Sequence, residues 1–281
     1  MKRIYYFFIL LAFFPMLASA HQPVVTESIN TTLADPEISK AYYGQLTGDP
    51  HLYFIEAKEP FALYVNILVP DITRQKKDVS FAVIKDGNTA KPLAVFDGIN
   101  FEWKHFWDPF GRDWYWQGPE YKIQAEAGKY EIRVWSSNND SKYSLAIGET
   151  ESFVGESAFR TLSLVPQIKR NFFNETPVGF IFSPLGYGYI LGLYLLAFIC
   201  GFLYRAILKN FAKNSPHGLT KNIGKSDRWM RALLGIGLLV WAVLTNWSPV
   251  LITASGFCFF EAMFSWCGFY AAIGKTTCPI E

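Results

Sequence analysis

Two long stretches without charge in the C-terminal third constrain this chain more than any other feature. Residues 177–204 contain no Asp, Glu, Lys or Arg, and residues 232–274 contain only Glu261. A helix of about 20 apolar residues crosses the hydrocarbon core of a bilayer. The first stretch therefore predicts a transmembrane helix at residues 177–204. The second is too long for one span and breaks at residues 246–249, so it predicts transmembrane helices at residues 229–246 and 250–273.

The first 20 residues have the pattern of a secretory signal peptide. Lys2 and Arg3 precede the apolar residues 4–17, and residues 18–20 are Ala-Ser-Ala, a small-x-small cleavage site. We therefore expect residues 1–20 to be removed and His21 to become the mature N-terminus. An uncleaved N-terminal anchor is the alternative for the same pattern.

The part of the chain between these segments has the pattern of a β domain. Residues 79–83, 130–134 and 143–147 carry apolar side chains at every second position, which is typical of half-buried strands. Residues 61–69 are more continuously apolar and predict a central strand. Turn signals separate the runs, and no helical pattern of ten or more residues interrupts them. We expect an all-β sandwich of jelly-roll type at residues 21–172, followed by an all-α membrane region of three transmembrane helices.

The charges are distributed unevenly along the chain. Residues 21–175 hold 16 Lys and Arg against 21 Asp and Glu, whereas residues 205–231 hold 7 Lys and Arg against one acidic residue. Loops rich in Lys and Arg stay in the cytoplasm. We therefore expect a periplasmic N-terminal domain, a basic cytoplasmic loop at residues 205–228 and a cytoplasmic tail at residues 274–281. The formal net charge of the whole chain is only +2, which argues against a nucleic-acid partner.

The C-terminal region carries two motifs on either side of an apolar hairpin. Residues 221–231 read Lys-Asn-Ile-Gly-Lys-Ser-Asp-Arg-Trp-Met-Arg, and residues 267–279 begin with Cys-Gly-Phe-Tyr and end with Thr-Cys-Pro. This arrangement resembles the YgaP-like inner-membrane two-helix family over about residues 221–281. Family members occur alone or joined to sulfur-handling rhodanese domains, so the resemblance implies a bacterial inner (plasma) membrane location and contact with the lipid bilayer. Gly268 departs from the Pro usual after the first Cys, and Glu261 departs from a mostly apolar last span.

The outer domain resembles the small jelly-roll modules found beside bacterial secreted peptidases. Residues 41–46, Ala-Tyr-Tyr-Gly-Gln-Leu, and the strand entry Gly-Lys-Tyr at residues 128–130 carry this likeness. It implies a binding or accessory role. The sequence also contains no phosphate-binding loop, no G-x-S-x-G or H-E-x-x-H motif and no paired-Cys zinc motif. We therefore expect a ligand-binding or scaffold protein that is not an enzyme, with a membrane or periplasmic protein as a candidate partner.

Ring side chains crowd into one segment of the outer domain. Residues 101–121 hold ten Phe, Trp, Tyr and His side chains, interspersed with charged residues. Aromatic faces flanked by carboxylates and Arg suit the recognition of sugars, peptides or headgroups. The alternative is that the rings fill the sandwich core or lie at the bilayer interface. The candidate ligand-binding residues are Trp103, His105, Trp107, Arg112, Asp113, Trp114 and Trp116.

The membrane region holds the candidate thiol and transport residues. All four cysteines lie in or after the predicted spans, and Cys267 and Cys278 would be about 16 Å apart along the axis of a continuous helix. They are either a sulfur- or metal-handling pair, which requires the tail to fold back, or inert packing residues. Glu261 has either a partner or a transport role, or it is a protonated side chain hydrogen-bonded to a neighbouring helix. Residues 188–192 form a small-x-x-x-small face, which predicts packing within the chain or a homodimer.

A copper site is a third hypothesis. The terminal amine and the imidazole of a mature His21 could chelate Cu(II), and His51 or His105 would complete the site. The alternative is an N-terminal segment without a metal. We expect no other cofactor.

Overall fold

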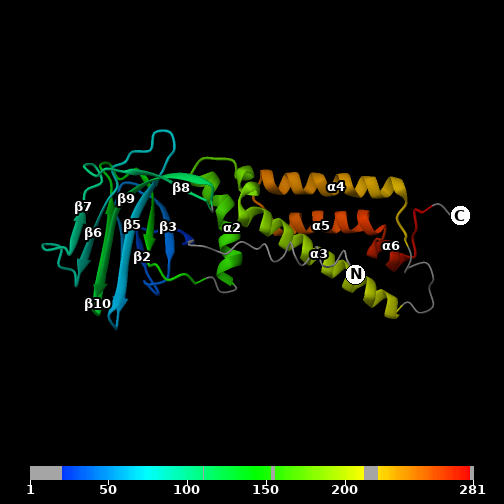
Figure 1. Cartoon of the computed structure of the whole chain (residues 1–281), viewed down its shortest axis with the longest axis horizontal. Helices are drawn as coiled ribbons and strands as arrows, with labels where there is room; N and C mark the ends of the chain where they lie inside the picture. The colour runs from blue at the N-terminus through cyan, green and yellow to red at the C-terminus, as the bar shows by residue number, and fades with distance from the viewer. Residues whose placement is uncertain (1–20, 110, 153–155, 212–220, 279–281) are drawn as a thin grey trace. The chain divides into compact units, whose positions relative to one another are not determined.

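The computed structural model describes residues 21–109, 111–152, 156–211 and 221–278. The chain divides into two compact units, Met1–Thr176 and Pro177–Glu281 (Figure 1). The predicted signal peptide, residues 212–220 of the predicted basic loop and residues 279–281 of the predicted tail lie outside the described residues.

The described part of the first unit contains eleven strands and one helix. Their bounds are β1 (Gln22–Val25), β2 (Asn30–Thr32), β3 (Lys40–Gln45), β4 (His51–Ala57), β5 (Phe61–Pro70), β6 (Ser80–Lys85), β7 (Ala94–Phe96), β8 (Lys104–Asp108), β9 (Asp113–Ala125), β10 (Gly128–Trp135), β11 (Lys142–Ile147) and α2 (Glu156–Asn171).

The strands form two sheets, in the orders β1-β3-β11-β5-β9-β8 and β2-β4-β10-β6-β7 (Figure 1). The alternation in β10 buries Tyr130, Ile132 and Val134, because every second side chain of a strand points to the same face. The continuously apolar β5 lies inside its sheet, between β11 and β9, as the sequence predicts. The two-sheet β domain is therefore confirmed.

The core of this unit lies between the two sheets. Tyr53 of β4 and Ile132 of β10 come from one sheet, and Leu63, Val65 and Ile67 of β5 come from the other. All five are inaccessible to solvent. Each buried apolar side chain of this size contributes roughly 1.5–3 kcal/mol, so the β domain has an apolar core of its own.

Helix α2 is an element that the sequence analysis did not predict. Its C-terminal end and the residues that follow pack on the sheet through rings: Phe172 meets Tyr43 of β3 at 5.0 Å, and Phe173 meets Tyr115 of β9 at 5.1 Å between ring centroids. Ile168 is buried in the same cluster. The prediction of an all-β domain at residues 21–172 is therefore wrong at its C-terminal end, where α2 covers part of one sheet.

The described part of the second unit is helical. Its elements are the 3-10 helix η1 (Pro177–Phe182) and the helices α3 (Pro184–Phe211), α4 (Lys225–Leu244), α5 (Pro249–Phe264) and α6 (Gly268–Ile273). Within the described residues, only the segment Pro184–Leu208 of α3 is long and apolar enough to cross a membrane.

The prediction of three membrane spans is thus confirmed for one helix and not for three. Helix α4 does not qualify as a membrane span, because its first two turns carry the charged residues Lys225, Asp227, Arg228 and Arg231. Helix α5 fails because it has 16 residues, about 24 Å of helix. It ends where Ser265 adopts a left-handed conformation with φ of 53°, a break that the apolar sequence around it does not reveal.

Helix α5 packs against both α3 and α4. The hydroxyl of Tyr194 on α3 lies 2.7 Å from Oγ of Ser255, and this Oγ donates a hydrogen bond of 2.7 Å to the carbonyl of Gly235 on α4. Ser255 therefore joins all three helices. The predicted small face at Gly192 has no neighbour within 4 Å of an added Cβ, whereas Gly201 of α3 faces the ring of Phe260. Gly192 is thus not used for packing within this unit.

Candidate functional site

The aromatic residues singled out by the sequence come together on the edge hairpin of the first unit. Strand β8 pairs with β9 in a register that places His105 opposite Trp116 and Trp107 opposite Trp114. Because the side-chain period of a strand is two, these four rings share one face of the sheet. Tyr115 points to the opposite face, where it contacts the rings that follow α2.

The four rings stack on one another, and we refer to them as the aromatic ladder. His105 stacks on Trp114 with centroids 4.2 Å apart and an angle of 11°, and it lies 4.6 Å from Trp116. Trp107 lies 5.0 Å from Trp114 at the other end. The Nζ atom of Lys77 lies 3.8 Å from the centre of the Trp116 ring, a cation–π contact.

Asp71 fixes two members of the ladder from one side. Its Oδ2 lies 2.8 Å from Nε2 of His105, and its Oδ1 accepts a hydrogen bond of 3.1 Å from Nε1 of Trp116. The other end is open to solvent, since Trp107 is 37% and Trp114 46% exposed. Two large apolar rings are therefore held in a defined geometry at the surface.

This arrangement limits what the ladder can bind. A sugar ring needs a free aromatic face, but the faces of His105 and Trp114 are directed at each other and Lys77 covers Trp116. The rings of Trp107 and Trp114 nevertheless keep a large part of their surface accessible. Such exposed Trp side chains are typical of protein–protein contacts, in which a few aromatic anchors carry most of the binding energy.

Trp103 and Arg112, from the same segment, lie elsewhere. Nε1 of Trp103 donates a hydrogen bond of 2.8 Å to the carbonyl of Gly98, and the ring packs against the core. Gly118 permits this, because an added Cβ there would lie 2.7 Å from the Trp103 ring. Arg112 occupies the turn between β8 and β9 with φ of 57°. Phe110 lies outside the described residues.

Asp113 belongs to a buried ion pair. Nζ of Lys169 on α2 lies 2.7 Å from its Oδ1, with side-chain exposures of 2% for Lys169 and 4% for Asp113. Burial raises the pKa of Asp113 to about 6, against the opposite effect of the Lys169 ammonium. The sequence analysis missed Lys169, and no local pattern could have found it, because 56 positions separate the partners.

The three candidate copper ligands have different partners. His21 hydrogen-bonds with Ser39, His105 with Asp71, and Nδ1 of His51 lies 2.7 Å from the hydroxyl of Tyr143. Burial lowers the pKa of His51. Within the described residues, no group of three or more His, Cys, Asp and Glu side chains is placed to hold a metal ion. A copper site at His21 stays a prediction.

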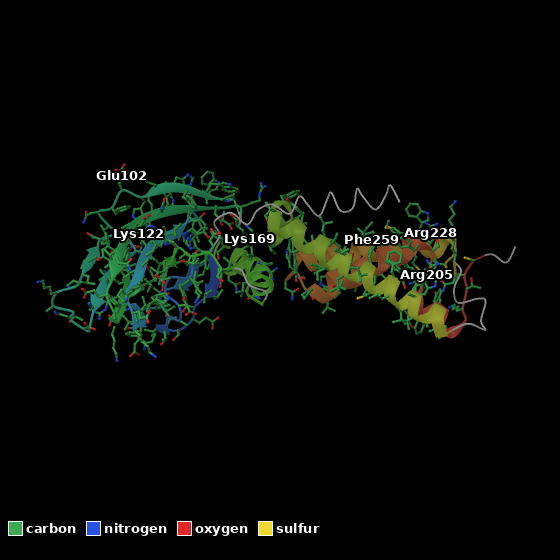
Figure 2. All side chains as sticks on the ribbon, turned by 60° about the horizontal axis from the view of Figure 1, so that its bottom comes forward. Glu102, Lys122, Lys169, Arg205, Arg228 and Phe259 are labelled. Carbon is green, nitrogen blue, oxygen red and sulfur yellow. The ribbon has the colours of Figure 1, made fainter. Side chains whose placement is uncertain are left out.

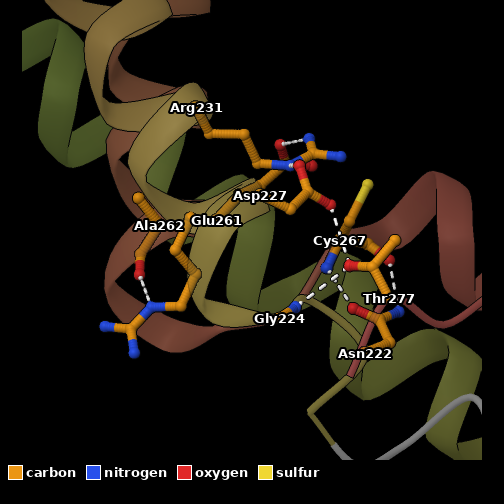
Figure 3. A network of polar contacts seen from close by, with 9 residues as sticks. Asn222, Gly224, Asp227, Arg231, Glu261, Ala262, Cys267 and Thr277 are labelled. Carbon is orange, nitrogen blue, oxygen red and sulfur yellow. Dashed lines mark hydrogen bonds and ion pairs between the residues drawn. The ribbon is translucent and has the colours of Figure 1, made fainter. Parts of the chain in front are cut away.

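The second unit contains a polar network around Glu261 (Figure 3). Glu261 of α5 forms an ion pair with Arg231 of α4, whose Nε also lies 3.1 Å from Oδ1 of Asp227. Oγ1 of Thr277 donates a 3.0 Å hydrogen bond to Oδ2 of Asp227 and accepts one of 3.0 Å from the amide of Gly224. Glu261 thus has a charged partner. The sequence analysis missed Arg231, although its spacing of four from Asp227 was a usable signal.

Asn222 joins the start of α4 to the end of the chain. Its side chain accepts a hydrogen bond of 2.8 Å from the amide of Cys267 and donates one of 2.9 Å to the carbonyl of Cys267. The backbone carbonyl of Asn222 accepts a hydrogen bond of 3.0 Å from the amide of Thr277. The tail therefore folds back on the segment before α4 (Figure 3). This is the arrangement that pairing of Cys267 and Cys278 would require.

The two thiols nevertheless have separate surroundings. Both cysteines are free, and Cys267 is buried while Cys278 is partly exposed. Sγ of Cys278 lies 3.5 Å from the carbonyl of Lys221. The continuous helix assumed from the sequence is broken between α5 and α6. Gly268, the departure from the family pattern, has a structural reason, because a Cβ there would collide with the ring of Tyr204 on α3.

Comparison with known families agrees with the C-terminal resemblance. Residues 219–281 match the family described as inner membrane protein YgaP-like, transmembrane domain. This region is therefore a YgaP-like transmembrane domain, and contact with the lipid bilayer follows from that class. No curated protein matches the chain.

Two solved structures are similar to part of the chain. The pre-peptidase C-terminal domain of a collagenase from Bacillus anthracis has 10% identity and a TM-score of 0.27, covering 42% of this chain and 92% of that one. CorA, a surface-associated copper-binding protein of Methylomicrobium album BG8, has 8% identity and a TM-score of 0.25, covering 45% of this chain and all of that one.

Proposed function

We propose that this protein is an accessory protein anchored in a bacterial inner membrane. Its β domain binds an extended segment of another membrane or periplasmic protein. The single observation that carries the proposal is the exposed aromatic ladder on β8 and β9. Trp107 and Trp114 are large, apolar and held against each other, and both are exposed to solvent and not part of the core. Burial of such rings by a partner protein would be favourable.

The position of the ladder supports an extended partner. Strand β8 is the last strand of its sheet, so one side of its backbone has no neighbouring strand among the described residues. The other edge strands are shorter, with four residues in β1 and three each in β2 and β7, against five in β8. A partner segment can add to such an edge by backbone hydrogen bonds, while the adjacent rings select its side chains.

The second unit supplies the membrane attachment in this proposal. We place α3 across the bilayer, with the α4–α5 hairpin embedded beside it. Five large apolar side chains of this hairpin are at least half exposed: Leu233, Val240 and Trp241 of α4, and Val250 and Met263 of α5. Apolar surface of this extent is stable in contact with lipid. The β domain is then periplasmic, and the basic segment before α4 and the C-terminus are cytoplasmic.

The test is site-specific photo-crosslinking of the full-length protein in intact membranes. A photoreactive residue at Trp107 should capture a protein partner, and one at Val95, which is exposed on β7 of the other sheet, should not. The Trp107→Ala, Trp114→Ala variant should lose copurification of that partner by at least tenfold. The matched control is Val95→Ala, Ile99→Ala, which truncates two exposed apolar residues away from the ladder.

Two outcomes would count against the proposal. The first is the same set of crosslinked proteins at Trp107 and Val95. The second is a folded Trp107→Ala, Trp114→Ala variant that retains every copurifying protein.

A sulfur- or metal-handling role for Cys267, Cys278 and Glu261 is a second candidate. One observation favours it, namely that the tail folds back on the segment before α4, as pairing of Cys267 and Cys278 would require. It ranks lower, because Cys267 is buried and Glu261 is already paired. Unchanged sulfane-sulfur and metal content in a Cys267→Ser, Cys278→Ser variant would remove this candidate.

A further inference from the structure

An open groove of about 600 Å³ lies in the second unit, beside the start of α4 and the end of α5. Its lining divides into two chemical kinds. Lys221, Lys225 and Arg228 are basic, and Trp229, Phe259 and Met263 are apolar. Arg228 and Phe259, one of each kind, are labelled in Figure 2.

Within the described residues, the basic side chains of the groove form no ion pair with a carboxylate. Among the described residues, no carboxylate lies within 4 Å of Lys221, Lys225 or Arg228. The two nearby acidic residues are occupied elsewhere, since both Asp227 and Glu261 pair with Arg231. Three cations therefore converge on one groove without a described counter-ion.

Two features orient this charge. Nε of Arg228 donates a hydrogen bond of 2.8 Å to the carbonyl of Ala262 on α5, which holds the guanidinium at the groove. Helix α4, which has 20 residues, begins at the same place, and its N-cap residue Gly224 offers no side chain to the first amides. The first amides of α4, which no described side chain caps, and the helix dipole add to the attraction of the lysines for an anion.

The apolar part of the lining shows which anion fits. Trp229 is 66% and Met263 62% exposed. A small hydrated anion would leave this surface uncovered, whereas an acyl chain would cover it. The groove lies in a YgaP-like transmembrane domain, where lipid is the surrounding solvent. Basic pockets next to membrane helices are typical sites for anionic headgroups.

We infer that this groove binds an anionic phospholipid, with the phosphate at Lys221, Lys225 and Arg228 and an acyl chain along Trp229, Phe259 and Met263. This inference concerns the second unit alone. It does not depend on the partner-binding role proposed for the β domain.

The test is native mass spectrometry of the full-length protein in detergent, titrated with phosphatidylglycerol or with zwitterionic phosphatidylethanolamine. Wild-type protein should retain phosphatidylglycerol preferentially. The Lys221→Gln, Lys225→Gln variant should weaken phosphatidylglycerol binding roughly 20- to 30-fold, since each lysine near a lipid headgroup contributes about fivefold. Both lysines are exposed, so the variant is expected to fold.

The matched control removes two positive charges from the same unit outside the groove. Arg205 lies over the ring of Trp266 and Lys275 over that of Tyr270, and neither lines the groove. The Arg205→Gln, Lys275→Gln variant should bind phosphatidylglycerol as wild type does. Equal loss in both variants, or equal retention of the two lipids by wild type, would overturn the inference. Displacement of bound lipid by glycerol phosphate at the same concentration would also overturn it, because a free phosphate would then suffice.

Discussion

One buried ion pair joins α2 to the β domain, beside the ring contacts of Phe172 and Phe173. Lys169 and Asp113 are nearly inaccessible to solvent, and their charged atoms lie 2.7 Å apart. Two charges removed from water depend on each other, because loss of one leaves the other buried and unpaired. Removal of one partner is therefore expected to lower the free energy of unfolding more than replacement of both.

We predict that Lys169→Met or Asp113→Asn alone lowers the free energy of unfolding by about 3 kcal/mol, and that the double variant costs clearly less than the sum. Urea unfolding of the full-length protein in detergent, followed by tryptophan fluorescence, measures this cycle. The exposed pair of Lys76 and Asp140, 3.4 Å apart, is the control, and its removal should cost less than about 1 kcal/mol. Additive effects at Lys169 and Asp113 would contradict the prediction.

The second residue-scale prediction concerns His51, which is buried beside Tyr143 in the core. Burial lowers its pKa in the folded state, so the unfolded state takes up a proton first as the pH falls. The contribution of His51 to stability is therefore full above its unfolded pKa of about 6.5 and declines below it, by at most about 1.4 kcal/mol per pH unit.

The comparison of wild type with His51→Gln isolates this effect, because all other titrating groups are shared. Wild type should lose more stability than His51→Gln between pH 7 and pH 5. Thermal unfolding in the same detergent at both pH values provides the measurement. Identical pH dependence in the two proteins would show that His51 does not gain a proton on unfolding.

At the scale of elements, the β8–β9 hairpin combines a structural and a binding role. Cross-strand aromatic pairs stabilise a sheet by about 0.5–1.5 kcal/mol each beyond their buried area. Removal of Trp107 and Trp114 should thus weaken the hairpin without unfolding the domain, whose core lies between the two sheets. For this reason, the loss of a partner in the Trp107→Ala, Trp114→Ala variant can be read as a loss of contact.

The elements also show where sequence patterns are sufficient. Period-two alternation predicted the strand at residues 130–134, because burial on one face imposes it directly. It also located the strand at residues 143–147, although both faces of β11 are buried and its outward-facing positions hold only the small residues Ser144 and Ala146. Because side chains alternate along β8 and β9, the sequence also indicates that His105, Trp107, Trp114 and Trp116 share one face of the sheet and that Tyr115 lies on the other. This alternation does not place Trp103, which precedes β8 and turns into the core over Gly118.

Other elements depend on contacts that no local pattern encodes. Helix α2 follows the last strand and carries Pro166 in its interior, which weakens the helical signal, and it is held by rings on strands far away in sequence. The end of α5 depends on the backbone conformation of Ser265 and on hydrogen bonds from the segment before α4. These features become visible only when distant parts of the chain are placed together.

At the scale of the whole molecule, charge and topology can be tested together. Residues 21–175 are net acidic and residues 205–231 strongly basic, which places the two regions on opposite sides of the membrane in our proposal. The cysteines provide a convenient probe, because the first unit has none and Cys278 is partly exposed near the C-terminus.

We predict that an impermeant maleimide labels an Asn138→Cys variant from the periplasmic side of cells whose outer membrane has been opened, because Asn138 is exposed in the loop between β10 and β11. Wild type should be labelled only after the inner membrane is opened. Cys278→Ser should abolish most of that signal, since Cys267 is buried and our proposal places Cys200 of α3 and Cys258 of α5 in lipid, out of reach of the polar reagent. Labelling of Cys278 before the inner membrane is opened would place the C-terminus outside. The basic groove would then face the periplasm, and the cytoplasmic side that we propose for the end of the second unit would be wrong, whereas the side of the β domain is decided by the Asn138→Cys variant.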